Sequence, residues 1–220
     1  MNKIIVFGNK EIAEIAHFYF KRDTDFEISA FTVDREFITE PTFHGLPVVP
    51  FDEVDQHFNP NEFSMFVALS YSKLNKLRKQ KYLESKARGY RFVTYVSSKA
   101  SYWDKSVIGE NCFILENVTL QPFSRIGDNV TIWSGTHIGH HVHIKDHSFI
   151  TSQVVISGGV TIGECSFIGV NATLRDHITV GADCIIGAGA LIMADAESEG
   201  LYTSQPSKRA EVSSHRIRSI

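Results

Sequence analysis

The chain has little of what marks several protein classes. It has three cysteines, and no two have the CxxC spacing, which argues against a disulfide framework or a structural zinc site. No apolar run approaches the roughly 18 residues of a membrane-spanning helix, and the start runs into a short strand rather than a signal peptide. With 22 basic against 25 acidic residues, no basic stripe indicates nucleic acid. We therefore expect a cytoplasmic protein that binds neither nucleic acid nor a membrane.

What the chain has in abundance is a six-residue repeat over residues 106–195. This stretch divides into fifteen consecutive hexads without an insertion, and the third position is Ile, Leu or Val in all of them, from Ile108 to Ile192. The first position is small or β-branched throughout. Fifteen such matches in a row would arise by chance with a probability on the order of 10⁻⁹, so the pattern is a true repeat.

The repeat predicts a parallel β-solenoid. Strand side chains alternate, so the first and third residues of each hexad both point inward. Three hexads make one triangular coil, which stacks residue n on residue n+18, and five coils rise about 24 Å. Gly in the fourth place and Asn or Asp in the sixth suit tight corners. Proteins with this hexapeptide pattern form a left-handed parallel β-helix, an exception to right-handed crossovers.

Residues 1–97 predict a small parallel α/β domain. The expected strands are residues 3–7, 26–33, 65–69 and 90–96, and the expected helices are residues 11–20, 51–58 and 73–87. Asp34 stands at the carboxyl end of the second strand. In the third helix we expect Leu74, Leu77 and Leu83 to face inward and the charged residues to form a solvated face.

This layout resembles a known family: a Rossmann-like domain over 1–97, then a left-handed β-helix with a C-terminal tail over 98–220. It is similar to bacterial nucleotide-sugar N-acetyltransferases and to sialic acid O-acetyltransferase-like proteins. The segments that carry the resemblance are KIIVFG, GYRFVTYVSSKA, SGTHIGHH, SGGVTIGECSFIGVNATL and IIGAGALI. The resemblance implies a homotrimer that binds acetyl-CoA between neighbouring solenoids and holds the nucleotide on the N-terminal domain.

The histidines of the repeat include the candidate catalytic base. Five of the ten histidines fall within residues 137–147. His140 occupies a corner, and the 18-residue stacking puts Pro122 below it and Gly158 above it, so it should face an open groove. The resemblance assigns the general base to His140, because an imidazole exchanges protons near neutrality. It also places the acetyl carbonyl on the N–H of Gly158, which has no Cβ to block the thioester.

The flanking positions depart from the family pattern. His141 stands where relatives often carry an acidic residue that orients the base, and we count it among the candidate substrate contacts. Phe149 replaces a histidine near the cofactor, and Trp133 replaces an asparagine. The tail resembles a GNPAK-like loop that closes on the cofactor, with Arg209 following its last matched position. The candidate cofactor-binding residues are Gly158, Phe149, Gly189, Pro206 and Lys208.

The nucleotide candidates lie at the carboxyl edge of the predicted sheet, where ligands bind in such folds. The first turn lacks the second Gly of GxGxxG, so an NAD site is not expected. The resemblance assigns this turn to the nucleotide. Asp34 is placed to accept from a pyrimidine N3–H, Tyr71 to stack on a base and Lys73 to meet a phosphate. The candidate nucleotide-binding residues are Gly8, Asn9, Lys10, Asp34, Tyr71 and Lys73.

Together these expectations indicate an acetyl-CoA-dependent N-acetyltransferase, without a metal, in surface-polysaccharide (lipopolysaccharide or O-antigen) or glycan biosynthesis. The acceptor would be a 4-amino-4,6-dideoxy sugar linked to dTDP or UDP. O-acetylation of a sugar such as sialic acid is the alternative within the same fold. The histidine cluster also admits a trimeric metal-dependent hydratase of the γ-carbonic-anhydrase type. A non-catalytic trimeric scaffold is the remaining hypothesis.

Overall fold

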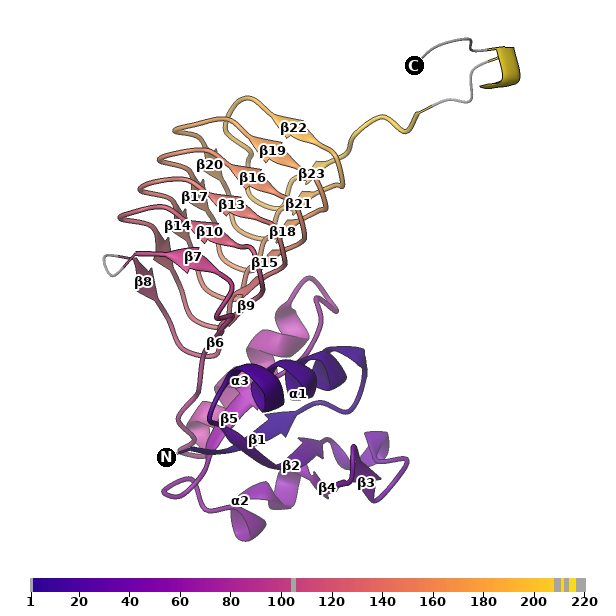
Figure 1. Ribbon diagram of the computed structural model, residues 1–220, viewed down its shortest axis with the longest axis vertical. Coiled ribbons are helices and arrows are strands. Elements are labelled where there is room, and N and C mark those ends of the chain that lie inside the picture. The colour runs from indigo at the N-terminus through magenta and orange to yellow at the C-terminus, as the bar shows by residue number, and fades with distance from the viewer. Residues whose placement is uncertain (1, 104–105, 208–210, 212–213, 217–220) are drawn as a thin grey trace.

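The computed structural model describes residues 2–103, 106–207, 211 and 214–216. They form two parts, an N-terminal α/β domain and a β-solenoid that rises from it (Figure 1). Among the described residues, no helix combines the length and the apolar character that crossing a membrane requires. The cytoplasmic location stays a prediction.

The N-terminal domain is a five-stranded sheet with the order β3-β4-β2-β1-β5, parallel except for β3. Its strands are β1 (Lys3–Phe7), β2 (Glu27–Val33), β3 (Thr42–Phe43), β4 (Leu46–Pro50) and β5 (Ser64–Val67). Its helices are α1 (Glu11–Asp23), α2 (Val54–His57) and α3 (Lys76–Ala87), with 3-10 turns at Arg35–Phe37 and Phe51–Glu53. The predicted Rossmann-like domain is confirmed, since its sheet is buried on both faces as parallel sheets usually are.

Alternate residues of β1 enter two different cores. Ile4 and Val6 pack with α1, and Ile5 and Phe7 pack on the other side of the sheet. The first of these cores also contains Phe113 and Leu115 from the solenoid. The two parts of the chain are therefore joined by a continuous apolar core and not only by a linker.

The solenoid consists of three parallel sheets whose strands are two residues long. We call the sheet nearest the N-terminal domain the docking sheet, because α1 and α3 pack against its residues and corners. The docking sheet comprises β6 (Tyr95–Val96), β9 (Phe113–Ile114), β12 (Thr131–Ile132), β15 (Phe149–Ile150), β18 (Phe167–Ile168), β21 (Ile185–Ile186) and β23 (Leu201–Tyr202). The second sheet comprises β7 (Ser101–Tyr102), β10 (Thr119–Leu120), β13 (His137–Ile138), β16 (Val155–Ile156), β19 (Thr173–Leu174) and β22 (Leu191–Ile192). The third sheet comprises β8 (Val107–Ile108), β11 (Arg125–Ile126), β14 (His143–Ile144), β17 (Thr161–Ile162) and β20 (Thr179–Val180).

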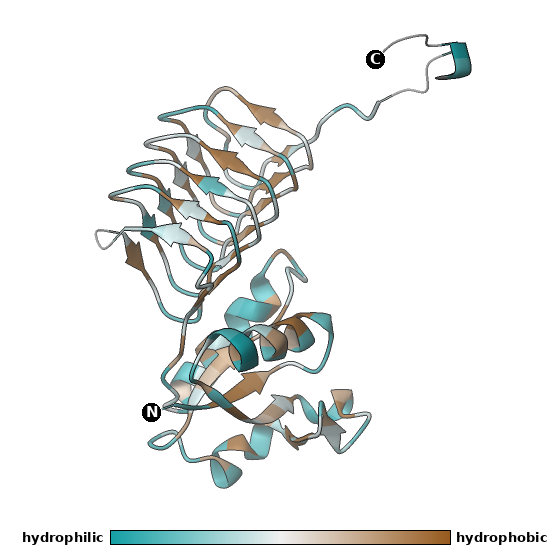
Figure 2. Ribbon diagram, viewed as in Figure 1, coloured by the Kyte–Doolittle hydropathy of each residue, from teal (hydrophilic) through white to brown (hydrophobic). Residues whose placement is uncertain are grey.

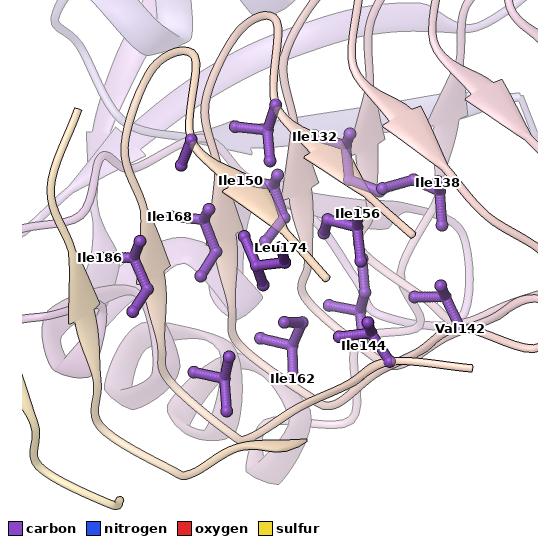
Figure 3. Close-up of a cluster of buried hydrophobic side chains, with 14 of the residues drawn as sticks. Ile132, Ile138, Val142, Ile144, Ile150, Ile156, Ile162, Ile168, Leu174 and Ile186 are labelled. Atoms are coloured by element: carbon purple, nitrogen blue, oxygen red, sulfur yellow. The ribbon is translucent and has the colours of Figure 1, made fainter. Parts of the chain in front are cut away.

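The hexad reading is confirmed strand by strand. β8 to β22 fall on the second and third residues of the fifteen hexads, and each pairs with the strand 18 residues away, as Ile132 does with Ile150. In Figure 3, Ile132, Ile150, Ile168 and Ile186 form one inward row. Figure 2 shows hydrophobic residues on many solenoid strands and hydrophilic residues on many corners.

The solenoid begins earlier and ends later than the hexads. The predicted strand 90–96 was assigned to the α/β sheet, and most of that assignment is wrong. Only Phe92 bridges to that sheet, at Met65, whereas Tyr95–Val96 pairs with Phe113–Ile114 as the first strand of the docking sheet. At the other end, β23 pairs with β21 beyond the last hexad.

Helix α3 differs from its prediction in its start and in its buried face. It begins at Lys76 because Lys73, Leu74 and Asn75 have φ values of 51°, 51° and 63°. Leu83, expected inside, is 47% exposed. The expected solvated charged face is also wrong, because α3 packs against the solenoid. The buried residues of α3 are Arg78, Lys81, Tyr82 and Ser85.

Candidate active site

His140 stands at the corner between β13 and β14, which we call the histidine corner. Its position in the predicted column is confirmed, since its carbonyl accepts the N–H of Gly159 (2.8 Å) and its own N–H donates to Gln121 Oε1 (2.9 Å). The side chain is exposed. The ring lies against Gly158 so closely that a Cβ added there would be 2.5 Å from Cε1 and 2.6 Å from Nε2. The imidazole can therefore lie there only because residue 158 has no Cβ.

The backbone N–H of Gly158 is an available donor beside that imidazole. Among the described residues, none accepts a hydrogen bond from it. At the corresponding place in other coils a side chain fills this role, as where Asp128 Oδ1 accepts from the N–H of Glu110 (2.9 Å). Gly158 is half-buried, so its N–H remains within reach of a ligand. An exposed base and an unused donor thus share one corner.

His141 lies next to the candidate base and contacts it. Nδ1 of His141 is 3.2 Å from Nδ1 of His140, and the two rings are nearly perpendicular at 82°. On its other side, the His141 ring packs on Phe123 with centroids 4.8 Å apart. The family resemblance implies an orienting acid at this position, and the structure puts His141 in contact with the His140 ring.

The other histidines of the repeat lie at different places, and His177 is the one whose ring lies over Gly159, next to the histidine corner. His137 lies on the second sheet between Thr119 and Val155, and His143 lies on the third sheet. His147 is buried at the corner between the third sheet and the docking sheet, next to Asn129. In the described ranges, no three His, Cys, Asp or Glu side chains are grouped so as to hold a metal ion.

Of the candidate cofactor residues, Gly158 is at the histidine corner, whereas Phe149 and Gly189 lie elsewhere on the solenoid. Phe149 is buried on the docking sheet against Tyr71 and Phe167, at centroid distances of 5.2 and 6.0 Å. Gly189, with φ +67°, is at the corner between the docking and second sheets, where Ser204 Oγ donates to the Ala188 carbonyl. Pro206 is exposed. Lys208, and Arg209 after it, lie outside the described residues.

Three of the candidate nucleotide residues, Gly8, Asn9 and Lys10, lie where β1 ends. Position 8 has no room for a Cβ, because that atom would lie 2.7 Å from the Ala68 carbonyl oxygen. The φ of Gly8 is +135°, which also favours glycine. Asn9 Nδ2 donates to the Phe37 carbonyl (2.8 Å), and Lys10 Nζ lies 6.0 Å from the Phe37 ring centroid. These residues occupy the turn from β1 to α1, as predicted.

Asp34 forms an ion pair that the sequence did not indicate. Its Oδ1 is 2.7 Å from Lys81 Nζ, and Glu84 holds the same ammonium at 2.8 Å. Burial by itself would lower the Lys81 pKa, but the bonds to the two carboxylates outweigh it and raise that pKa. A sequence signal for this ion pair does exist: Lys81 lies on α3, the helix that follows β5.

A pocket of about 760 Å³ opens beside Asp34. Its lining residues are Asp34, Arg35, Glu36, Phe51, Asp52, Gln80, Lys81, Glu84, Ala87 and Arg88. Of the predicted nucleotide contacts only Asp34 lines it, and Gly8, Asn9, Lys10, Tyr71 and Lys73 do not. Tyr71 is half-exposed and packs on the docking sheet, with its ring 4.7 Å from that of Phe167. The structure therefore does not bring all the predicted nucleotide contacts into one pocket.

Comparison with known proteins supports the fold over nearly the whole chain. The family model "Bacterial transferase hexapeptide (six repeats)" matches residues 105–139, 123–158 and 159–194. A search by sequence against curated proteins gives no significant match.

Three solved structures share both parts of the chain. The acetyltransferase domain of PglB from Neisseria gonorrhoeae is 24% identical, with a TM-score of 0.80 over 89% of this chain and 93% of that one. The second is perosamine N-acetyltransferase from Caulobacter crescentus, with one histidine replaced by asparagine and with CoA and GDP-perosamine bound. It is 24% identical, with a TM-score of 0.80 over 91% of this chain and 93% of that one. WeeI from Acinetobacter baumannii is 17% identical, with a TM-score of 0.75 over 90% of this chain and 94% of that one. The predicted resemblance is confirmed at the level of the fold, an α/β domain followed by a left-handed β-helix.

Proposed function

We propose that this protein is an acetyl-CoA-dependent N-acetyltransferase of a nucleotide-linked amino sugar. The observation that carries the proposal is the histidine corner, where the exposed imidazole of His140 lies against Gly158, whose N–H has no acceptor among the described residues. Acyl transfer to an amine is assisted by a base that takes the amine proton and by a donor to the developing oxyanion, and this corner offers a candidate for each. The fold shared with perosamine N-acetyltransferase supports the same chemistry.

The reaction follows from these two groups. The lone pair of the sugar amine attacks the thioester carbonyl carbon, and the nitrogen passes one proton to His140 Nε2. The Gly158 N–H donates to the oxygen on which negative charge develops, a contact that contributes roughly 3 kcal/mol in other enzymes. The C–S bond then breaks, the carbonyl re-forms as an amide, and the thiolate of CoA takes the proton back from His140. No acyl-enzyme is formed.

We place the complete site between two chains of a homotrimer. The histidine corner joins the second and third sheets, so it is the edge of the prism opposite the docking sheet and its N-terminal domain. The nucleotide edge near Asp34 and the cofactor candidate Gly189 therefore lie away from His140 in one chain. A neighbouring chain supplies the other wall, with acetyl-CoA in the groove between solenoids.

The proposed acceptor is a 4-amino-4,6-dideoxy sugar linked to dTDP or UDP, with its nucleotide in the pocket beside Asp34. The Asp34 side chain is 27% exposed, and Lys81 meets its Oδ1, which leaves Oδ2 to accept from a pyrimidine N3–H. The cations Lys81 and Arg88 are in the lining, and a diphosphate would have to take them from the carboxylates of Asp34, Glu84 and Asp55. Because the relative from Caulobacter binds GDP-perosamine, a guanine nucleotide is a necessary arm of the test.

The direct test is release of CoA with a panel of acceptors: dTDP-, UDP- and GDP-linked 4-amino sugars, and sialic acid for the O-acetylation alternative. We expect turnover with a nucleotide-linked amine and none with the hydroxyl acceptor. Turnover with sialic acid alone would establish O-acetylation instead. Failure with every acceptor, together with stoichiometric bound zinc, would favour the hydratase hypothesis.

The role of His140 has its own test. We expect His140→Ala to lower kcat by at least about 100-fold with little change in the KM for acetyl-CoA, because only proton transfer is lost. His143→Ala is the matched control, since that histidine lies on the exposed face of the third sheet. Near-full activity of His140→Ala would remove the general-base role and leave the transferase proposal in place.

A further inference from the structure

The contact between His140 and His141 requires a proton on one Nδ1 atom and a lone pair on the other. Their Nδ1 atoms are 3.2 Å apart, and a hydrogen bond at this distance needs one proton between them. If both Nδ1 atoms carry protons they repel, and if neither does the two lone pairs face each other. A neutral imidazole has only one N–H. The contact therefore couples the tautomer of one ring to that of the other.

His141 is held in place from two sides. Its ring packs on the Phe123 ring one coil below, at 4.8 Å between centroids and 34° between planes. Its backbone has φ +57°, and its N–H bonds to the Pro122 carbonyl (3.4 Å). The residue one coil above is Gly159, and the His177 ring lies over it, with Nδ1 2.4 Å from where a Cβ would be. The Nδ1 edge of His141 is thus directed at His140 by packing.

The His140 ring also has defined neighbours. The ring lies over Gly158, with Cε1, Nε2 and Nδ1 at 2.5, 2.6 and 3.0 Å from where a Cβ would be, and Nδ1 also contacts His141. The two ring nitrogens therefore have separate surroundings. Nδ1 is engaged by the second histidine, whereas Nε2 has no hydrogen-bond partner among the described residues.

We propose that His141 is a positioning residue that selects the reactive tautomer of His140. Nδ1 of His141 accepts the Nδ1–H of His140, which leaves the lone pair of His140 on Nε2, beside Gly158. When Nε2 takes the proton of the amine, the Nδ1–H···Nδ1 bond becomes charge-assisted and strengthens as charge develops. His141 does this as a neutral acceptor and needs no carboxylate. The inference rests on the proposed function for its kinetic part only.

The tautomer can be observed without any substrate. Long-range ¹⁵N–¹H correlation spectra of the histidine rings, with His140 assigned through His140→Gln, report which nitrogen carries the proton. We expect neutral His140 to be the Nδ1–H form in the unmodified protein. We expect His141→Phe, which keeps the ring packed on Phe123, to lose this preference, and His141→Asn, whose amide oxygen accepts, to restore it. An Nε2–H form of His140 in the unmodified protein overturns the inference.

The kinetic arm uses the same variants. Loss of an orienting partner commonly costs about 10- to 100-fold, so His141→Phe should lower kcat by that factor with an unchanged KM for acetyl-CoA. His141→Asn should recover most of it, and His143→Phe, the control, should alter neither kcat nor the spectrum. Full kcat in His141→Phe contradicts a positioning role. If no acceptor is turned over, the proposed function fails while the tautomer result still decides the His140–His141 interaction.

Discussion

At the scale of single residues, the close contact between His140 and Gly158 makes the glycine sensitive to one added carbon. Gly158 has no positive φ, so its backbone can accept alanine. The new Cβ would displace the exposed His140 ring, because that ring is the nearest movable group. Gly158→Ala should therefore lower kcat by about 100-fold, comparable to losing a general base, while the N–H donor is kept.

The stability cost of this change should be small, within about 0.5 kcal/mol as for other surface substitutions. The measurements are kcat and the urea midpoint, with Ser157→Ala as the neighbouring control. Unchanged kcat would show that the ring position near Gly158 does not matter.

His147 is the residue for which the structure predicts a pH effect on stability. Burial lowers its pKa to about 4, with further contributions from Arg78 and Lys79, and its Nδ1 lies 2.9 Å from Asn129 Nδ2, whose N–H it can accept. The unfolded chain has an ordinary histidine pKa of about 6.5. Between these two values only the unfolded state binds the proton, so the stability present above pH 6.5 declines as the pH falls toward 4.

The expected loss is on the order of 3 kcal/mol across that window. Urea denaturation at pH 7.5 and pH 4.5 measures it, and His147→Gln should reduce the difference. His143→Gln, exposed on the third sheet, is the control that should leave the pH dependence unchanged. An identical pH dependence in His147→Gln would show that the loss comes from other groups.

At the scale of elements, helix α3 is held to the solenoid by polar contacts that its sequence does not reveal. Arg78 is 1% exposed and binds the carbonyls of Asn129, His147 and Ser148. Around it, Lys76, Lys79 and Lys86 pair with acidic corner residues of the solenoid. A charged helical face usually predicts contact with solvent, whereas here it matches a row of carbonyls and carboxylates.

Arg78→Met should destabilise the protein by about 3 kcal/mol or more, because buried carbonyl groups lose their donors. Lys76→Met is the matched control on the same helix. Its side chain is 47% exposed, and an exposed ion pair contributes about 0–1 kcal/mol. The measurement is the free energy of unfolding in urea, and equal effects of the two substitutions would contradict the importance of the buried guanidinium.

At the scale of the whole molecule, the proposed site needs residues from two different edges of the solenoid. His140 is at the corner of the second and third sheets, and Gly189 is at the corner of the docking and second sheets. If each groove combines the two corners from different chains, two inactive variants should complement each other. Co-assembly of His140→Ala with Gly189→Asp chains should restore about a quarter of the grooves by random assortment.

The measurement is CoA release after the two variants are unfolded, mixed and refolded together, compared with each variant treated alone. Sedimentation gives the number of chains in the active species. Absence of any restored activity in mixed trimers would place both corners in the same chain's site, and a monomer would rule out the inter-chain groove.

In the N-terminal domain, local sequence patterns predict some elements well and the start of α3 poorly. The segments 3–7 and 11–20 were predicted close to β1 and α1, because apolar runs and helical periodicity are properties of neighbouring residues. The helix expected to begin at residue 73 begins at Lys76, since Asn75 donates to the carbonyl of Cys165 far along the chain and anchors a left-handed turn. No signal within ten residues of Asn75 indicates that partner.

The solenoid was determined by the sequence alone, including the inward column, the corners and the stacking of His140 under Gly158. The reason is that each hexad carries its own alternation and corner residues, and identical spacing leaves one way to stack them. Only the tertiary structure decided which face of α3 is buried, that Tyr95–Val96 belongs to the solenoid, and that His141 meets His140 through Nδ1. These depend on contacts between distant segments and on ring orientations, which arise when the parts pack together.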